Sequence, residues 1–149
     1  MKTIIAAVDF SDATPPVVAI AVSFAKCFDA NLLLFHAIEP EPGFVTYGFN
    51  TIEYPGMFDL REETERRATK LMEDLLVRVR AELPNASSHC AYGSPLHELL
   101  AQVKQTGADF VIVGSHGHGA LSSLLLGSVA EGMVRKATIP VLVVPRAHE

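Results

Sequence analysis

Short apolar runs recur along the chain, separated by longer stretches whose apolar residues have helical spacing. The runs are TIIAAV at 3–8, NLLLFHAI at 31–38, SSHCAY at 87–92, ADFVIVG at 108–114 and PVLVVP at 140–145. SSHCAY is the weakest of the five. NLLLFHAI shows no alternation of apolar and polar residues, as expected for a parallel strand that is covered on both faces. The pattern predicts five strands.

Two longer helices are predicted in the first half of the chain. The first begins where Ser11, Asp12 and Thr14 offer N-cap side chains, just before a Pro-Pro pair that suits a first helical turn. The second runs from about 58 to 83. The apolar stripe of this second helix, expected to face the core, comprises Leu60, Ala68, Leu71, Met72, Leu75, Val79 and Leu83.

Two further helices are predicted in the second half of the chain. One follows Ser94 as its N-cap and stops at Gly107, and the last begins at Gly127 and Ser128 and ends near Ala137. Residues 39–57 fit neither a helix nor a strand, because they are rich in Pro, Gly and aromatic residues. We expect these residues to form a long irregular insertion.

Strands that alternate with helices predict an α/β fold with an open five-stranded parallel sheet and helices on both faces. We expect a single domain over 1–149. In such sheets ligands bind beyond the carboxyl ends of the strands, where the strand order reverses. These ends read Asp9-Phe10-Ser11, His36-Ala37 and GSHG at 114–117. If the first and fourth strands are neighbours, the three segments meet at one crevice.

Composition narrows the function classes. The formal net charge is −5, which gives no indication of a nucleic-acid or membrane surface, and no apolar run reaches the roughly 18 residues of a membrane span. The two cysteines, Cys27 and Cys90, lie in apolar contexts. A structural disulfide remains open, but two buried thiols in a reducing cytoplasm are the favoured interpretation.

The segment GSHGHGALSSLLLGSV at 114–129 combines glycines, histidines and a leucine run. Gly114 and Gly117 follow a strand directly, and Gly127-Ser128 opens the last helix, so free backbone amides and a helix N-terminus are expected to converge there. Such an arrangement binds anions. The alternative is that the glycines only turn the chain and Ser128 is an N-cap. The P-loop, dinucleotide and G-x-S-x-G motifs do not fit.

These residues resemble a known family. The spacing G-x2-G-x9-G-S from Gly114 to Ser128 is accompanied by VDFS at 8–11, HAIEP at 36–40, YGSPLHELL at 92–100 and PVLVVP at 140–145. Together they closely resemble the ATP-binding branch of the universal stress protein family, over essentially the whole chain apart from 39–57. The resemblance implies a Rossmann-like sheet in the order 3-2-1-4-5 and ATP as ligand, with Mg²⁺ as a further candidate.

The resemblance also implies roles for individual residues. Asp9 would contact the nucleotide near its ribose, Ala37 would meet adenine through its backbone, and Val113 and Gly114 would line the ribose side. The phosphates would be held by amides and one hydroxyl of Gly117, Gly127, Ser128 and Val129. Family dimers usually pair through the last strand, which here comprises Val141, Leu142, Val143 and Val144.

The chain departs from the family pattern at one position. Members often carry Arg or Lys just after the second glycine, where this chain has His118, and no Lys or Arg occurs between Gln105 and Val134. Phosphate charge would therefore be met by amides, the helix dipole, Mg²⁺, or a protonated His116 or His118. This leaves ATP, ADP and AMP open as the preferred nucleotide.

The histidines support no catalytic or metal role by themselves. His116 and His118 have metal-pair spacing without an evident third ligand, and His36 is expected to be a half-buried strand-end histidine. The leading hypothesis is a cytoplasmic, homodimeric, nucleotide-responsive regulator without catalytic residues. Two alternatives remain: a slow ATPase or autophosphorylating enzyme that uses Asp9 with Mg²⁺, and a dimeric interaction module that binds no nucleotide.

Overall fold

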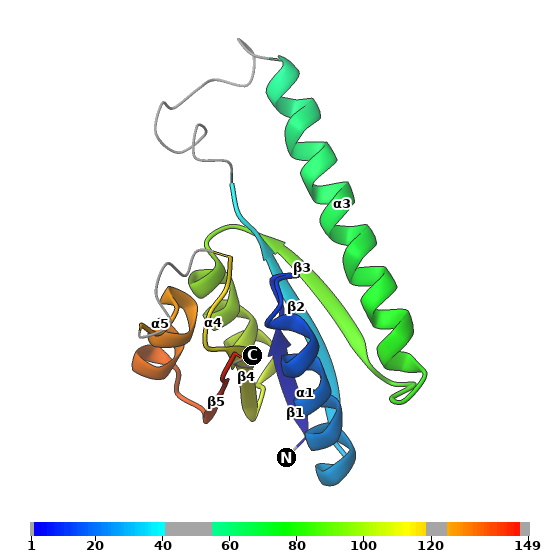
Figure 1. Ribbon diagram of the computed structural model, residues 1–149, viewed down its shortest axis with the longest axis vertical. Coiled ribbons are helices and arrows are strands. Elements are labelled where there is room, and N and C mark those ends of the chain that lie inside the picture. The colour runs from blue at the N-terminus through cyan, green and yellow to red at the C-terminus, as the bar shows by residue number, and fades with distance from the viewer. Residues whose placement is uncertain (1, 41–54, 119–124, 147–149) are drawn as a thin grey trace.

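The strands of this computed structural model, which describes residues 2–40, 55–118 and 125–146, form one sheet. The strand order is β3-β2-β1-β4-β5, and every neighbouring pair is parallel. The strands are β1 (Thr3–Ala7), β2 (Asn31–Ile38), β3 (Ser87–Tyr92), β4 (Phe110–Gly114) and β5 (Val141–Val144). The predicted fold class and sheet order are therefore confirmed (Figure 1).

Strand limits follow the apolar runs closely. The strands β2 and β3 have the predicted bounds, whereas β4 begins at Phe110 instead of 108. Asp109 lies just before β4, and its Oδ2 accepts the N–H groups of Lys2 and Thr3 at 2.7 and 3.0 Å. Asp109 thus ties the start of β4 to the start of β1 through its side chain.

The four described helices cover both faces of the sheet. They are α1 (Thr14–Phe28), α3 (Pro55–Arg80), α4 (Pro95–Thr106) and α5 (Ser128–Lys136). One core cluster joins side chains of α1 and α3 to alternate residues of β1 and β2, such as Ala6 and Leu34. The second joins α4 and α5 to the intervening residues, such as Ile5 and Phe35. Burial on both faces explains the unbroken apolar runs of the inner strands.

One predicted N-cap is confirmed and one is wrong. Ser94 occupies the N-cap position of α4, as predicted, whereas that of α1 is Ala13, and neither helix has a side-chain cap hydrogen bond. The hydroxyl of Ser11 instead donates to Asp9 Oδ1 at 2.6 Å and accepts the N–H of Ala13 at 3.2 Å. Ser11, which the sequence predicts as an N-cap, therefore donates its hydroxyl hydrogen to the carboxylate of Asp9 instead.

Helix α3 is placed earlier than predicted. It begins at Pro55 and ends at Arg80, so residues 55–57, which we expected to be irregular, are helical. Proline is compatible with a first helical position, because its missing N–H would have no partner there. Residues 41–54 of the predicted insertion lie outside the described residues. The side chains of Leu60 and Leu71 are 49% and 41% exposed, so the buried stripe is narrower than expected.

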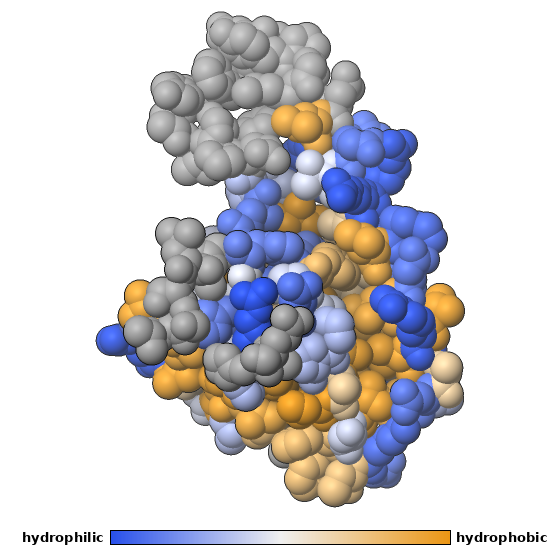
Figure 2. All heavy atoms as spheres, in the orientation of Figure 1, coloured by the Kyte–Doolittle hydropathy of each residue, from blue (hydrophilic) through white to orange (hydrophobic). Residues whose placement is uncertain are grey.

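Both cysteines are free thiols. Cys90 is half-buried, but Cys27 is exposed, which corrects the prediction of two buried thiols. Cys27 lies in the last turn of α1, on the side away from the buried residues Ala21 and Ala25. Within the described ranges, no helix is long and apolar enough to cross a membrane. Figure 2 shows hydrophilic side chains along α3 beside a broader hydrophobic surface.

Candidate functional site

The carboxyl ends of β1, β2 and β4 meet at one cavity of about 960 Å³. Because β1 pairs with both β2 and β4, the segments that follow these strands are brought together, as the sequence predicted for neighbouring first and fourth strands. All of the predicted ligand residues line this cavity: Asp9, Ala37, Val113, Gly114, Gly117, Gly127, Ser128 and Val129. Their roles toward a ligand stay predictions.

Asp9 uses its two carboxylate oxygens differently. Oδ1 accepts the backbone N–H of Ser11 at 2.9 Å, the hydroxyl of Ser11 at 2.6 Å and that of Thr14 at 3.4 Å. These bonds fix the turn into α1. Oδ2 faces Gly117, where an added Cβ would lie only 2.5 Å from it. One oxygen therefore holds the protein's own chain, while the other borders the cavity.

Ser115 joins the end of β4 to β5 and α5. Its N–H donates to Val144 O at 2.7 Å, and its carbonyl accepts the N–H of Gly127 at 2.7 Å. The amide of Gly127, which the sequence assigned to phosphate binding, is therefore already used within the protein. An added Cβ at Gly127 would lie 3.1 Å from Ser115 O, so the glycine permits close approach of the two segments.

Helix α5 directs its first turn into the cavity. Gly127 is the N-cap, and Ser128 is the first helical residue, so Ser128 is not the N-cap that the alternative interpretation required. Glu131 N–H donates to Gly127 O at 2.9 Å. The N–H groups of Ser128, Val129 and Ala130 belong to the turn that has no partner within its own helix. This end of the helix also carries the positive part of the helix dipole.

Three histidines surround the same strand ends. The ring of His118 donates from Nε2 to the carbonyl of Asp9 at 2.7 Å, and Nδ1 of His36 donates to Val8 O at 2.8 Å. Burial lowers the pKa of His36, which is half-buried as predicted. Nδ1 of His116 lies 2.8 Å from Ser115 Oγ. Its Nε2 is buried without a hydrogen-bond partner among the described residues.

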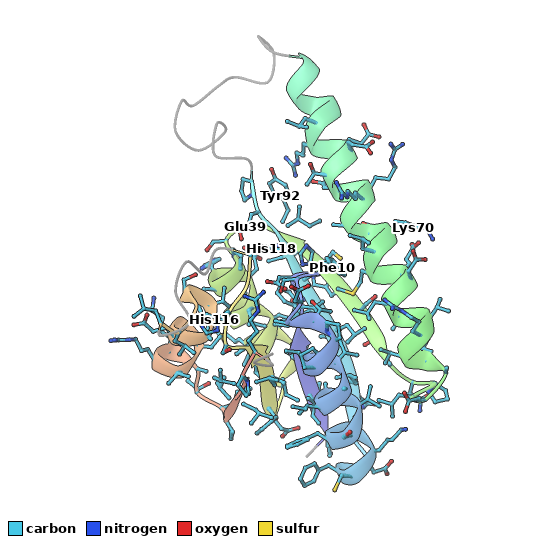
Figure 3. The ribbon with its side chains drawn as sticks, viewed as in Figure 1. Phe10, Glu39, Lys70, Tyr92, His116 and His118 are labelled. Atoms are coloured by element: carbon cyan, nitrogen blue, oxygen red, sulfur yellow. The ribbon has the colours of Figure 1, made fainter. Side chains whose placement is uncertain are left out.

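The ring of His116 places one buried nitrogen at the border of the cavity. Ser115 Oγ accepts the backbone N–H of Arg146 at 3.2 Å. It also contacts Nδ1 of His116, where the hydroxyl can donate or accept according to the tautomer of the ring. Nε2 is the other ring nitrogen, and His116 lines the cavity (Figure 3).

Two arginines that line these hollows were not predicted from the sequence. Arg67 of α3 lines the main cavity. Arg146, just beyond β5, lines a smaller adjoining hollow with Gly117 and His118, and its Nη2 lies 3.3 Å from Asp12 Oδ2. Both arginines lie outside the segment from Gln105 to Val134, which contains no Lys or Arg. The apolar run ending at 145 was the available signal, because the end of a strand beside β4 returns to the same crevice.

Phe10 is a further residue that sequence reasoning did not single out. Its backbone has φ +60°, an uncommon conformation for a residue with a side chain. The ring of Phe10 packs against the ring of His36, with 4.7 Å between the two ring centroids. The strained backbone turns the chain sharply after β1, between Asp9 and Ser11. Among the described residues, no group of three or more His, Cys, Asp or Glu is arranged to hold a metal ion.

Comparison of the sequence with known proteins finds one family that matches nearly the whole chain. The model of the universal stress protein family matches residues 1–145. The chain is 31% identical over 141 residues to universal stress protein YxiE of Bacillus subtilis, an alignment that spans 93% of this chain and 95% of the relative.

Several solved structures share the fold. Universal stress protein UspA from Lactobacillus plantarum superposes with a TM-score of 0.83 at 24% identity, over 96% of this chain and 97% of that one. A universal stress protein in complex with cAMP superposes with a TM-score of 0.63 at 22% sequence identity, over 98% of each chain. A universal stress protein family protein from Arabidopsis thaliana with AMP bound superposes with a TM-score of 0.69 at 19% sequence identity. The alignment covers 99% of this chain and 93% of that one. This chain belongs to the universal stress protein family.

Proposed function

We propose that the cavity binds an adenine nucleotide, with ATP as its ligand, and that the protein is a nucleotide-responsive stress regulator. One observation carries the proposal: all the predicted ligand residues, including Asp9, Gly117 and Ser128, line one cavity. Two proteins of similar fold are described as complexes with cAMP and with AMP. Residues 1–149 would form a single nucleotide-binding domain.

The phosphate end of the cavity would be formed by α5 and the loop after β4. The first-turn amides of α5, the hydroxyl of Ser128 and the amide of Gly117 are donors suited to an anion. Nε2 of His116 is a further buried polar atom that has no partner among the described residues. In the tautomer that carries the proton on Nε2, a phosphate oxygen there would be stabilising, because an unpaired buried donor costs free energy. Gly127 would contribute by close approach and not through its amide.

The nucleoside would lie toward β1 and β2. Asp9 Oδ2 would accept a ribose hydroxyl while Oδ1 keeps its bonds to Ser11 and Thr14. The backbone of Ala37 would contact adenine, and Val113 and Gly114 would line the ribose. Mg²⁺ commonly binds through one or two carboxylates together with substrate phosphates. Asp9 fits that role, and the ion would neutralise phosphate charge.

A regulator fits the site better than an enzyme does. Hydrolysis needs a general base within reach of the attacking water. Nε2 of His118 donates to Asp9 O and Nδ1 of His116 contacts Ser115, so neither nitrogen is free to act as that base, and Nδ1 of His118 is the acceptor that remains in its neutral ring. We expect any turnover of ATP to be slow, and its loss on substitution of Asp9 with binding retained would instead favour the enzyme.

We also propose a cytoplasmic homodimer that pairs through β5. The strand β5 contacts β4 alone within the described sheet, so its other edge is unpaired there. The carbonyls of Pro140 and Val144 accept bonds from the β4 side. Backbone groups alternate in direction along a strand, so those of Val141 and Val143 face the outer edge. Free thiols at Cys27 and Cys90 agree with a reducing compartment.

Calorimetric titration tests the ligand proposal. We expect ATP to bind the parent protein and Ser128→Ala to weaken ATP about tenfold, as for loss of one charge-assisted hydrogen bond, while adenosine affinity stays unchanged. The matched control is Ser94→Ala, because Ser94 is also an exposed serine at a helix start but does not line the cavity. Absence of binding by ATP, ADP, AMP and cAMP, with no nucleotide in the purified protein by mass spectrometry, would contradict the proposal.

A further inference from the structure

The cavity continues beyond the proposed nucleotide residues. On the sheet face covered by α4 and α5, it is lined by Phe35, Leu99 and Ala130, which belong to one core cluster. It also reaches the opposite face, where Val8 and Phe10 belong to the other cluster. The end of β1 therefore lies between two parts of one cavity. We call the part beneath α3 the α3 pocket, defined by Phe10, His36, Thr64, Arg67, Ala68 and Leu71.

One face of α3 forms the wall of the α3 pocket. Thr64, Arg67, Ala68 and Leu71 follow one another at helical spacing, so they lie on the same side of the helix. Leu71 is 41% exposed although it is a large apolar residue that lines a cavity. Covering such a side chain with an apolar ligand removes apolar surface from water, which is favourable.

The floor of the α3 pocket is aromatic. The rings of Phe10 and His36 lie 4.7 Å apart at an interplanar angle of 52°, and Figure 3 shows Phe10 between α3 and the strand ends. Because Nδ1 of His36 donates to Val8 O, its Nε2 is the remaining acceptor of the neutral ring. A flat ring packs well against such surfaces.

Charge in the α3 pocket favours one anionic group. Arg67 has no carboxylate partner among the described residues, whereas its neighbour Arg66 pairs with Glu63. A guanidinium binds a carboxylate through two parallel hydrogen bonds. Glu39 also lines the cavity, and Asp9 lies at its border with the nucleotide site. These carboxylates oppose a ligand with several negative charges.

We propose that the α3 pocket is a second ligand site, which binds a small aromatic carboxylate with its ring against Phe10, His36 and Leu71 and its carboxylate on Arg67. The whole cavity has a volume of about 960 Å³ and extends to both faces of the sheet, so the α3 pocket lies apart from the residues assigned to the nucleotide. The second site rests on the proposed function in one respect: the nucleotide is assigned to the part of the cavity outside the α3 pocket.

The probe for this site is 1-naphthoate, with uncharged 1-naphthalenemethanol as the matched neutral compound. The chain contains no Trp, so naphthyl fluorescence can be followed without indole emission. Arg67→Gln should weaken naphthoate about tenfold and leave the alcohol unchanged. Leu71→Gln should weaken both compounds. Arg66→Gln and Val77→Gln are the controls, because both residues are exposed on α3 and do not line the cavity.

The outcomes separate this inference from the nucleotide proposal. We expect ATP affinity to be the same in the two control variants, Arg66→Gln and Val77→Gln. Naphthoate binding with the expected pattern, in a protein that binds no nucleotide, would support the α3 pocket and contradict the proposed function. The α3 pocket is contradicted by absence of saturable naphthoate binding, by equal effects of Arg67→Gln and Arg66→Gln, or by competition with ATP together with weakening by Gly117→Ala.

Discussion

His118 Nε2 lies 2.7 Å from the backbone carbonyl of Asp9 and so joins the loop after β4 to the end of β1. The contact holds an imidazole where β1 and β4 open into the cavity. The ring lines both the main cavity and the smaller hollow beside Arg146. The ring of His118 therefore borders the proposed phosphate end of the cavity.

Nucleotide affinity should depend on His118, because its ring holds the loop after β4 against the end of β1. We expect His118→Ala to weaken ATP, since the loop that carries Gly117 would lose this contact. Calorimetric titrations of the parent and the variant measure both affinities. Equal affinities would remove His118 from the account of phosphate binding.

Gly117→Ala should weaken ATP binding through Asp9. The new Cβ would lie 2.5 Å from Asp9 Oδ2, and the bonds of Oδ1 to Ser11 and Thr14 limit how far that carboxylate can move. We expect a loss of about tenfold in the parent, and less than about twofold when Asp9 is first replaced by Ser. The same tenfold loss in both backgrounds would show that the backbone, and not the carboxylate, is affected.

Arg146 should strengthen binding of phosphates but not of the nucleoside. Its guanidinium is exposed and pairs with Asp12, so its contribution should resemble that of a surface charge. We expect Arg146→Gln to weaken ATP about two- to fivefold and leave adenosine unchanged. Arg135→Gln is the control, because Arg135 is also exposed but pairs with Glu131 on α5. Equal losses in the two variants would point to a general charge effect.

The free energy of unfolding should fall in mild acid because of His36. Burial lowers the pKa of the folded protein's His36 below the ordinary value of 6.5. As the pH drops through about 6.5, the unfolded chain therefore takes up a proton that the folded protein does not, and stability decreases. His36→Gln removes this titration, so urea unfolding at about pH 8 and pH 5 should show a smaller loss for the variant. A loss as large as the parent's would assign the effect to other groups.

Val143→Pro should separate dimerisation from folding. The N–H of Val143 faces the outer edge of β5, so proline there removes no bond to β4, whereas it blocks strand pairing across that edge. We expect a monomer by light scattering with unchanged circular dichroism. Val143→Thr keeps the N–H and should remain dimeric. A proline variant that stays dimeric would contradict pairing through β5.

Much of the fold could be predicted because apolar periodicity reports burial directly. NLLLFHAI gave the limits of β2, since a strand covered on both faces must be apolar throughout. Side-chain caps could not be predicted in the same way. Ser11 looks like an N-cap in the sequence, but it bonds to Asp9, and that choice depends on how the turn after β1 is shaped by Phe10.

The candidate site was predictable where its residues are consecutive and missed where they converge from distant segments. The segment following β4 and the start of α5 carry a recognisable glycine spacing. Arg67 and Arg146 carry no such signal, because their places depend on the path of α3 and on β5 ending beside β4. The internal use of the Gly127 amide likewise appears only once Ser115 and α5 are placed in space.

Titration of ¹⁵N-labelled protein with ATP, followed by amide chemical shifts, tests the central claim most directly. The account predicts that the largest changes occur at Gly117, Ser128 and Val129, with smaller ones at Ala37 and little change along the α3 pocket. Saturable shifts that are absent from the start of α5 and from Gly117, or no shifts at all, would contradict nucleotide binding at the carboxyl ends of β1 and β4.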